Sequence, residues 1–345
     1  MKEGNLKMET LRTGRFKKTV SFIALFLILA MVLGSLAGAL TGCGAQSGSG
    51  QKTKVRIAAL KGPTTIGLVH LIDKAERGEA KGDYEFTMYT QGSDVMAAMA
   101  AGETDIGLVP SNVACVMNKK VEGGVTVIDI NTLGVLNCVT GNAEIASIAD
   151  LSGKTVYMTG QGATPEYTMR YLLDMNGVTD CNIEFKSEPT EVVALLSENY
   201  DAVGILPQPF ATAALLQDRA FNIAFSLDDE WAKVNDSCNI ITGVTVVSNK
   251  FLENNKDAVD TFLSEHKDSV DLALSNVDDT ARLVVEQGII AKEPLAKKAI
   301  PNCNIVCITG KEMRESLGGY LQVIFDMDPK TLGGSLPEDG FYYEK

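Results

Sequence analysis

Short apolar runs alternate with amphipathic stretches along the chain from about residue 54 onwards. Residues 54–60 form a mostly apolar run of strand length, and the loop after it opens a stretch whose apolar side chains recur at helical spacing. Residues 84–88 then alternate apolar and polar positions, which is the pattern of a half-buried strand. Strands that alternate with helical segments in this way are typical of an α/β fold.

The same order of elements recurs about one hundred residues later in the chain. Three landmarks, each a short motif at the end of a predicted strand or at the start of a predicted helix, pair at a near-constant separation. The pairs are Gly107-x-x-Pro110 with Gly204-x-x-Pro207 (97 residues apart), Ser93-Asp94-Val95 with Thr190-Glu191-Val192 (97), and Gly62-x-Thr64 with Gly162-x-Thr164 (100). One pair could reflect the general likeness of βα units, but three in the same order predict two related lobes.

After about residue 240 the pattern changes to one strand, at 242–247, followed by long helical stretches at 249–276, 278–287 and 311–325. The second lobe is therefore expected to be inserted into the first. We predict a two-lobed α/β fold, each lobe a mainly parallel sheet flanked by helices. Lobe 1 comprises 54–138 plus 243–345 and lobe 2 comprises 140–240, with a hinge of two crossovers at 136–140 and 243–247.

The first 42 residues have the layout of an export signal. Residues 1–18 carry six basic and two acidic side chains, and an uncharged, mostly apolar run follows from 19 to 40. The run ends in Leu40-Thr41-Gly42-Cys43, which resembles the lipobox of bacterial lipoproteins, where a peptidase cuts before a lipidated cysteine. A single transmembrane anchor is the alternative, since such a run could span a bilayer. We predict a signal peptide over 1–42, a lipidated Cys43, and a flexible Gly- and Ser-rich tether over 43–53.

The chain is acidic, with a formal net charge of −13, and the predicted cleavage lowers this to −17 for the remaining 303 residues. Apolar residues make up 45% of the chain and charged residues 22%, which is the composition of a folded globular protein. Phosphate binding needs clustered Lys and Arg, so the charge argues against a nucleic-acid partner.

Histidine is scarce, and the cysteines are poorly spaced for metal or redox chemistry. His70 lies in an apolar stretch and is expected to be a hydrogen-bonded core or rim residue, whereas His266 is expected on a helix surface. Two histidines leave little material for a His-based metal site or a nucleophile–base centre, so we predict no metal, no cofactor and no catalysis. The six cysteines besides Cys43 are expected to be buried free thiols, with disulfides as the alternative in an exported protein.

The loops that follow the predicted strands are the candidate ligand site. In an open α/β sheet, ligands bind beyond the carboxyl ends of the strands, where helices begin. Such loops, rich in Gly, Ser, Thr, Asn, Gln and Pro, expose backbone N–H groups and helix dipoles that favour a polar or negative ligand group. Ordinary capping and turn chemistry is the alternative for any one of these residues. The six loops are residues 61–65, 91–93, 110–112, 160–164, 187–190 and 207–210.

Other ligand classes fit the sequence less well. The Gly160-x-Gly162 turn lacks the third glycine of a dinucleotide motif, and no Gly-Lys-Ser/Thr phosphate loop is present. The six loops hold one basic residue, Lys61, which is too little for a multiply charged phosphate. The acidic run 228–230 beside Trp231 is typical of a solvated helix start, with a site for a cationic group as the alternative.

Residues 96–107, with the pattern Gly102-x-x-Asp105-x-Gly107, resemble a helix and strand of the solute-binding lipoproteins of ABC importers. The branch that they resemble is the nitrate, sulfonate, taurine and thiamine-precursor group, and residues 148–154 are similar to the segment that enters its second lobe. The resemblance covers residues 54–325 and implies the type II periplasmic-binding-protein fold, with a ligand held between the lobes. By position it implies ligand contacts from Thr64, Thr65, Gln91, Gly92, Ser111, Gln161, Ala163 and Gln208, to which the loops add Asn112 and Thr164.

The function implied by the resemblance is the capture of a small polar solute, either anionic or heteroaromatic, and its delivery to an ABC permease with its ATPase. The chain departs from the family in having no arginine among these positions, which argues against simple sulfonate or nitrate binding. We expect a monomer, lipid-anchored at the extracytoplasmic face of the bacterial cell membrane. The alternative is an exported two-lobed enzyme that uses carboxylates such as Glu166 and Glu188, although no nucleophile–base pair is visible.

Overall fold

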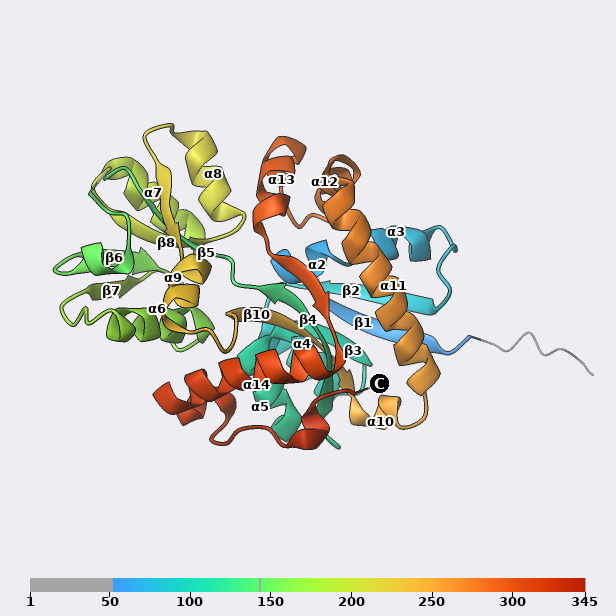
Figure 1. Ribbon diagram of the computed structural model, residues 1–345. Helices are drawn as coiled ribbons and strands as arrows, with labels where there is room; N and C mark the ends of the chain where they lie inside the picture. Colours follow the sequence, from blue (N-terminus) through green and yellow to red (C-terminus); the bar gives the residue numbers. More distant parts are fainter. Residues whose placement is uncertain (1–51, 143, 345) are drawn as a thin grey trace, which may run out of the picture. The chain divides into compact units, whose positions relative to one another are not determined.

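The computed structural model describes residues 52–142 and 144–344, which form two β-sheets with their helices (Figure 1). The predicted signal peptide, Cys43 and nearly all of the predicted tether lie outside the described residues. Within the part of the chain that the structure describes, no helix combines the length and the apolarity needed to cross a membrane.

The first sheet has six strands in the spatial order β11-β4-β10-β3-β1-β2. Strands β1 to β4 run in one direction, while β10 and β11 run in the opposite direction. The sheet is therefore mixed rather than mainly parallel: β1 pairs in parallel with β2 and β3, whereas the three pairs formed by β10 and β11 are antiparallel. Its strands are β1 (Lys54–Leu60), β2 (Asp83–Tyr89), β3 (Ile106–Pro110), β4 (Val125–Leu133), β10 (Ile241–Ser248) and β11 (Ile305–Ile308).

The second sheet has five strands in the order β7-β6-β8-β5-β9. Four of them run in one direction and β5 runs against its two neighbours. Each sheet with its helices forms one lobe of the predicted two-lobed fold. The strands are β5 (Leu136–Thr140), β6 (Thr155–Met158), β7 (Asn182–Phe185), β8 (Val203–Pro207) and β9 (Asn222–Ser226).

The two sheets repeat one arrangement, which accounts for the paired sequence motifs. The parallel triplet β2-β1-β3 of the first sheet corresponds to β7-β6-β8 of the second, and one antiparallel strand follows in each case. In the second sheet that strand is β5, which directly precedes β6 in sequence, whereas in the first sheet it is β10, which follows β9 of the second lobe. The second lobe is therefore inserted between β4 and β10 of the first.

The crossovers lie beside the predicted positions rather than at them. Residues 136–140 and 243–247 are paired strands, β5 and most of β10, because these apolar, β-branched runs are buried within the sheets. The chain instead leaves the first sheet at Gly134-Val135 and returns through residues 227–240, which include helix α9.

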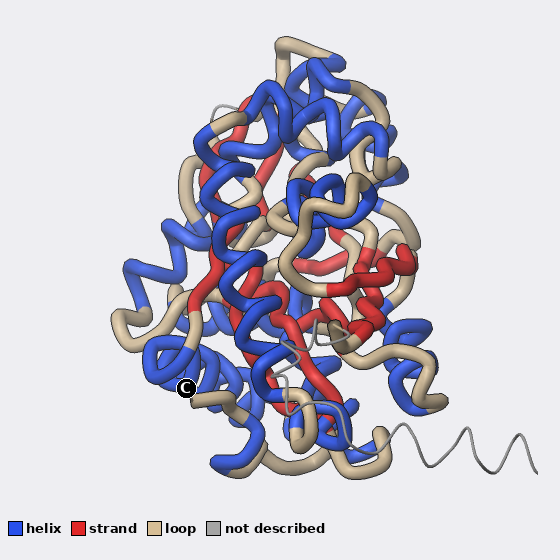
Figure 2. Tube along the Cα trace, turned by 90° about the vertical axis from the view of Figure 1, so that its right-hand side faces the viewer, coloured by secondary structure: helices blue, strands red, loops and turns tan. Residues whose placement is uncertain are grey.

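Helices connect the strands and pack on the sheets, as Figure 2 shows with helices in blue and strands in red. The helices of the first lobe before the crossover are α2 (Pro63–Ile66), α3 (Val69–Glu76), α4 (Gly92–Ala100) and α5 (Ser111–Lys120). Those of the second lobe are α6 (Thr164–Met175), α7 (Pro189–Glu198), α8 (Phe210–Gln217) and α9 (Leu227–Val234). The chain then forms α10 (Asn249–Leu252), α11 (Lys256–Ser275), α12 (Val277–Glu286), α13 (Glu293–Ala299) and α14 (Gly310–Met327).

Helix α14 packs against both lobes and adds contacts that the crossovers alone would not provide. The hydroxyl groups of Tyr320 on α14 and Thr168 on α6 lie 3.1 Å apart. The ring of Trp231 on α9 contacts two tyrosine rings, with a centroid distance of 5.6 Å to Tyr320 and of 4.6 Å to Tyr171.

The acidic run beside Trp231 is thus no ligand site. Trp231 is buried and donates its indole N–H to a backbone carbonyl, and Glu230 is buried too.

The structure corrects the prediction for one histidine and confirms the prediction for the other. His266 is fully buried, not on a helix surface, because it shares the inner face of α11 with Phe262 and Val270 at helical spacing. His70 is a buried, hydrogen-bonded residue as expected, with Nε2 2.9 Å from the Thr280 hydroxyl. The six cysteines of the described residues are free, and four of them are buried, as predicted.

Candidate functional site

A cleft of about 800 Å³ lies where the carboxyl ends of strands from both sheets meet. Its walls come from the loops after β1, β2 and β3 of the first sheet and after β6, β7 and β8 of the second. Each of the six predicted loops contributes at least one residue, and the volume is that of a site for a small molecule. The polar residues on the wall are Lys61, Thr90, Gln91, Asn112, Thr159, Thr164, Thr168, Glu188, Gln208 and Thr242.

Five of the ten residues predicted to bind ligand lie on this wall. They come from both lobes, so the structure brings together residues that are up to 117 positions apart in the chain. These five residues are Gln91, Asn112, Ala163, Thr164 and Gln208.

The other five lie off the wall, and three of them have hydroxyl groups that are already paired. Thr64 and Thr65 both donate to the carbonyl of Leu60 at the end of β1, over 3.1 and 2.6 Å. Ser111 donates to the carbonyl of Ile241 over 2.7 Å. Gly92 begins α4, and Gln161 is exposed at the loop before α6. The buried hydroxyl groups therefore hold the loops of the cleft in place.

The helices that begin at the cleft have no side-chain cap. No N-cap side chain accepts a hydrogen bond at the start of α4, α5, α6, α7 or α8, each of which has eight or more residues. The helix starts predicted at Ser93-Asp94 and Thr190-Glu191 are one residue late, because α4 begins at Gly92 and α7 at Pro189. Missing caps are not peculiar to the cleft: of the helices that begin elsewhere, α9 and α12 are capped by Ser226 and Asn276, whereas α11, α13 and α14 have no side-chain cap. Backbone N–H groups at the cleft are thus left for water or a ligand.

Gln208 presents an unpaired donor on the cleft wall. Its side-chain oxygen Oε1 accepts from the hydroxyl of Thr212 over 2.7 Å and from the Thr212 N–H over 3.3 Å, which fixes the orientation of the amide. Its nitrogen Nε2 has no partner, although the residue is only 1% exposed. A buried amide N–H without a partner costs about 1–3 kcal/mol. A ligand with a hydrogen-bond acceptor would remove that cost.

The charges on the wall are few and opposite in sign. Lys61 follows β1 in the first lobe and Glu188 follows β7 in the second, and neither forms an ion pair with any residue that the structure describes. No arginine of the described chain lines the cleft. The rest of the wall is largely apolar, so the cleft suits a solute with little net charge and an apolar body.

One hydrogen bond joins the lobes across the cleft. Thr164, the first residue of α6, donates its hydroxyl hydrogen to Oδ1 of Asn112 on α5 over 3.0 Å. Because that oxygen accepts, the amide NH₂ of Asn112 can donate to a ligand. Thr168, one turn further along α6, lies at the junction with Tyr320 of α14.

Several wall residues were not predicted from the sequence. They are apolar or small, and they come from the connections between the sheets, from the strand ends next to them, and from the loop after α12. The crossover residues could have been inferred, since any segment that joins two lobes passes the cleft between them. The residue after α12 has no local motif and could not have been found. The residues concerned are Val135, Leu136, Ile240, Thr242 and Ile289.

Comparisons with solved structures agree with the fold. The crystal structure of an ABC transporter protein from Parabacteroides distasonis is 22% identical, with a TM-score of 0.72, over 85% of this chain and 100% of that chain. The periplasmic aliphatic sulphonate binding protein SsuA from Escherichia coli is 15% identical, with a TM-score of 0.64, over 79% and 87%. The periplasmic nitrate-binding protein NrtA from Synechocystis PCC 6803 is 11% identical, with a TM-score of 0.58, over 82% and 84%. These similarities confirm the predicted two-lobed type II fold.

The sequence comparisons identify the family. No curated protein matched the sequence. The family model described as NMT1/THI5 like matches residues 83–280, which is more than half of the chain and includes strands of both sheets. The chain belongs to the NMT1/THI5-like family.

Proposed function

We propose that the protein is the extracytoplasmic solute-binding component of an ABC importer. The observation that carries this proposal is the cleft, which is built from equivalent strand ends of two related sheets and lined by uncapped helix starts. Solved structures that share the fold are named as ABC transporter, sulphonate-binding and nitrate-binding proteins. The proposed partners are therefore a small-molecule solute and an ABC permease with its ATPase.

The proposed solute is small, has an apolar body, and offers at least one hydrogen-bond acceptor. The acceptor would face the unpaired Nε2 of Gln208, while the uncapped helix starts and the Asn112 amide supply further donors. A fully charged sulfonate or nitrate fits less well, because Lys61 is the single cation on the wall and no arginine lines it. A heteroaromatic solute, or a singly anionic solute with an apolar body, matches these features.

The enzyme alternative has less support from the same geometry. Of its two carboxylates, Glu166 accepts from the N–H of Gly162 and from Nε of Arg170, each over 2.7 Å, so it is occupied at the start of α6 and lies off the wall. Glu188 lines the cleft, but no histidine, serine or cysteine stands beside it on the wall. A nucleophile–base pair is thus missing from the described cleft.

Identification of the bound solute tests the proposal. Small molecules released from the purified protein should be identified by mass spectrometry and returned to the solute-free protein in a thermal-shift assay. A correct solute at 100 times its Kd stabilises the protein by about 2.7 kcal/mol. Turnover of that molecule by the protein, or the failure of every released or screened solute to bind, would contradict the proposal.

The membrane attachment is proposed to be lipid on Cys43, with the mature protein a monomer at the outer face of the cell membrane. The support is the basic and apolar leader that ends in Leu40-Thr41-Gly42-Cys43. Replacement of Cys43 by Ala should remove the lipid and the membrane association without changing solute affinity. Recovery of a correctly cut, membrane-bound and lipid-modified Cys43→Ala protein would refute the anchor.

A further inference from the structure

Three metal-ligating side chains converge beneath α11, in the first lobe and away from the cleft. They are Asp129 of β4, His266 of α11 and Cys307 of β11. One carboxylate oxygen, one ring nitrogen and the Sγ atom all lie within 4.8 Å of one another. Asp129 and His266 are 0% exposed, and Cys307 is half-buried. The three residues come from positions far apart in the chain, so the fold itself assembles the cluster.

The protein's own hydrogen bonds orient this cluster but do not complete it. Asp129 Oδ2 lies 3.1 Å from His266 Nδ1, and Asp129 Oδ1 accepts from the hydroxyl of Thr245 over 2.9 Å. Thr245 in turn accepts from the amide of Asn131 over 3.1 Å. His266 Nε2 has no partner although it is buried. A carboxylate held in place by a second layer of hydrogen bonds is typical of a metal ligand.

The donor set selects a class of ion. Mg²⁺ and Ca²⁺ prefer oxygen ligands, whereas a sulfur, a nitrogen and an oxygen together suit Zn²⁺ and related transition-metal ions. Two nitrogen or oxygen ligands of a tetrahedral Zn²⁺ lie about 3.4 Å apart, so the 3.1 Å between Asp129 and His266 needs little adjustment. Small shifts of Cys307 would bring its Sγ atom to the same ion.

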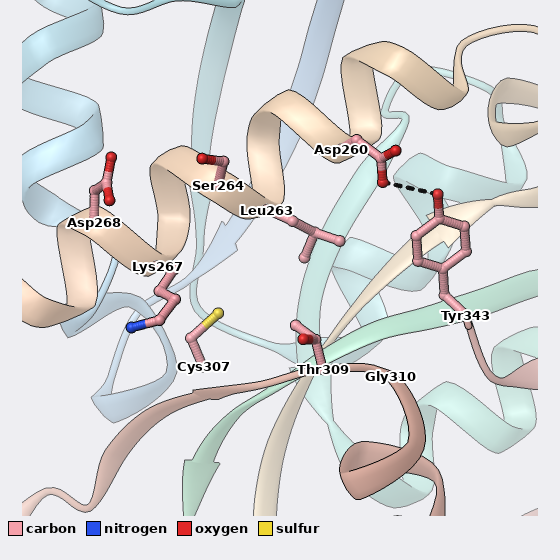
Figure 3. Close-up of a pocket in the computed structure, with 9 residues that line it drawn as sticks. All are labelled: Asp260, Leu263, Ser264, Lys267, Asp268, Cys307, Thr309, Gly310 and Tyr343. Atoms are coloured by element: carbon pink, nitrogen blue, oxygen red, sulfur yellow. Dashed lines mark hydrogen bonds between the residues drawn. The ribbon is translucent and has the colours of Figure 1, made fainter. Parts of the chain in front are cut away.

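A second cavity gives the cluster a route to solvent. This cavity of about 300 Å³ is lined by Cys307 and by residues of α11 (Figure 3). Figure 3 shows Cys307 pointing from β11 towards α11, which carries Asp260, Lys267 and Asp268 along the same cavity. Lys267 forms an ion pair with Asp271, with 2.8 Å between Nζ and Oδ2, so the carboxylate of Asp271 offsets the positive charge of Lys267. The cavity gives an ion an approach lined by carboxylates, and it has room for a water molecule as a further ligand.

A reactive thiol is the less fitting role for Cys307. Burial raises the pKa of the Cys307 thiol far above its ordinary value, and the nearby Asp129 raises it further. Reactive cysteines have a lowered pKa in an electropositive setting, which is the opposite of this one.

We propose that Asp129, His266 and Cys307 bind a transition-metal ion of the Zn²⁺ type, which ties α11 and the edge strand β11 to its neighbour β4. The ion would be structural and would lie outside the solute cleft. The expectation of no metal site rested on the small number of histidines and on the cysteine spacing, neither of which shows that the fold brings His266 and Cys307 together with Asp129. The proposal does not depend on the identity of the solute.

Titration of the metal-free, reduced full-length chain with Co²⁺ tests the proposal, because a Co²⁺–thiolate bond gives a charge-transfer band in the near ultraviolet. We expect a band that saturates at one equivalent of Co²⁺ and is displaced by Zn²⁺. Cys307→Ser should abolish the band, while Cys181→Ser, at another half-buried cysteine, should leave it unchanged. Asp129→Asn should weaken Zn²⁺ binding at least tenfold, measured by competition with a chromophoric chelator.

A second readout uses the unaltered protein, in case the Cys307 variant does not fold. Zn²⁺ should slow alkylation of Cys307 at least tenfold without slowing that of Cys181, as measured by mass spectrometry of the labelled peptides. Absence of a thiolate band in the unaltered protein, an undiminished band in Cys307→Ser, or equal alkylation of Cys307 with and without Zn²⁺ would each overturn the proposal. Solute affinity should be the same with and without Zn²⁺, which separates this test from that of the proposed function.

Discussion

Gln208 lines the cleft, is held by its oxygen and has a buried nitrogen without a partner, so a change of one atom can test its role. Gln208→Glu keeps an oxygen for the Thr212 hydroxyl but replaces the donor at Nε2 by an acceptor. We expect the affinity for the solute to fall at least tenfold, which corresponds to about 1.4 kcal/mol. Isothermal titration calorimetry with the identified solute measures the change.

A matched control for Gln208, which lies in the turn before α8, is found at the end of that helix. Gln217 ends α8 and is exposed, so Gln217→Glu should leave the affinity unchanged. Equal affinity of Gln208→Glu and the unaltered protein would show that the Gln208 amide does not contact the solute.

Asp228 is the residue whose ionisation should affect stability most directly. It opens α9 beside the crossover, so close to Gly134 that a Cβ atom on that glycine would lie 2.0 Å from Asp228 Oδ1. Burial, and secondarily the charge of Asp229, raise the pKa of Asp228 to about 7, while the N–H of Gly134 lowers it in part. Tyr320 of α14 also lies within electrostatic reach of the carboxylate.

The sign of the pH effect follows from this raised pKa. Because the folded protein holds the proton more tightly than the unfolded chain, the free energy of unfolding should fall as pH rises from about 4 to about 7. Asp228→Asn should remove this fall and raise the free energy of unfolding at pH 8 by roughly 1–2 kcal/mol, less than the full shift implies because the side chain is only half-buried. Urea denaturation at several pH values measures the free energy of unfolding.

The control is Asp174→Asn, at an exposed position of α6, which should leave the pH profile of stability unchanged. A pH profile of Asp228→Asn that runs parallel to that of the unaltered protein would contradict the assignment.

At the residue scale, the sequence located the loops of the cleft better than the side chains within them. Loop positions follow from where strands end, and all six predicted loops reach the wall. Whether a hydroxyl faces the ligand or its own backbone depends on tertiary neighbours, as with Ser111, whose partner is the carbonyl of Ile241 on a strand 130 residues away. The burial of His266 could have been predicted, since its spacing from Phe262 and Val270 puts it on the apolar face of α11.

The repeated Gly-x-x-Pro motif has a packing role at the element scale. A Cβ atom on Gly107 of β3 would lie 2.9 Å from Val95 of α4, and one on Gly204 of β8 would lie 2.9 Å from Val192 of α7. The absence of a side chain at both glycines therefore lets α4 pack closely on β3, and α7 pack closely on β8. The same solution occurs once in each lobe, 97 residues apart.

Alanine at either glycine should destabilise the protein. We expect Gly107→Ala and Gly204→Ala each to lower the free energy of unfolding by about 1–3 kcal/mol through overpacking. Gly318 on α14 is the matched control, because a Cβ atom there would have only Tyr342 Oη nearby, at 3.8 Å, and Gly318→Ala should stabilise the helix by about 0.5–1 kcal/mol. Thermal or urea unfolding compares the three variants, and a neutral effect at both motif glycines would contradict the packing role.

Helix boundaries were predicted less well than helix positions. The predicted helix at 249–276 is divided into α10 and α11, because the chain turns at residues 253–255 before Lys256. Helices α4 and α7 begin one residue before their predicted starts, at Gly92 and Pro189, without side-chain capping. Side-chain caps are also missing at α11, α13 and α14, so a Ser or Thr near a helix start does not by itself fix the first helical residue.

At the scale of the whole molecule, the lobes contact each other on two sides of the cleft. Figure 1 shows α13 next to α8 near the top of the view, and α14 next to α6 lower down. The α14 contact has a buried aromatic cluster of Tyr320, Trp231 and Tyr171, whereas α13 and α8 meet through short helices. We therefore expect lobe motion to separate α13 from α8 and to leave α14 on α6.

Distances between spin labels test this motion. A pair on α13 and α8 should be further apart in the solute-free protein than with solute bound, and a control pair on α14 and α6 should not change. A shift from 1:99 to 99:1 closed requires about 5.5 kcal/mol of differential affinity, which needs solute contacts from both lobes. Tight binding with no change at α13 and α8 would show that the lobes are rigid.

The two-lobed plan was predictable from the sequence because the repeat of Gly107-x-x-Pro110 at Gly204-x-x-Pro207 records it directly. The precise crossovers were not, since an apolar run such as 136–140 has the same pattern in a linker strand as in a sheet. The third connection through α14 was also not predictable, because its contact with α6 joins residues about 150 positions apart.

The late return of β10 to the first sheet has a consequence for how the chain folds as it is synthesised from its N-terminus. All five strands of the second sheet come from one stretch, residues 136–226, so that sheet can be completed as soon as this stretch is available. The first sheet cannot, because β10 lies between β3 and β4 and begins 108 residues after β4 ends. Until then the edges of β3 and β4 have no partner, and unpaired edges are where strands of other chains add. The lobe that starts first is therefore finished last, and the nascent protein depends on protection of these edges during that interval.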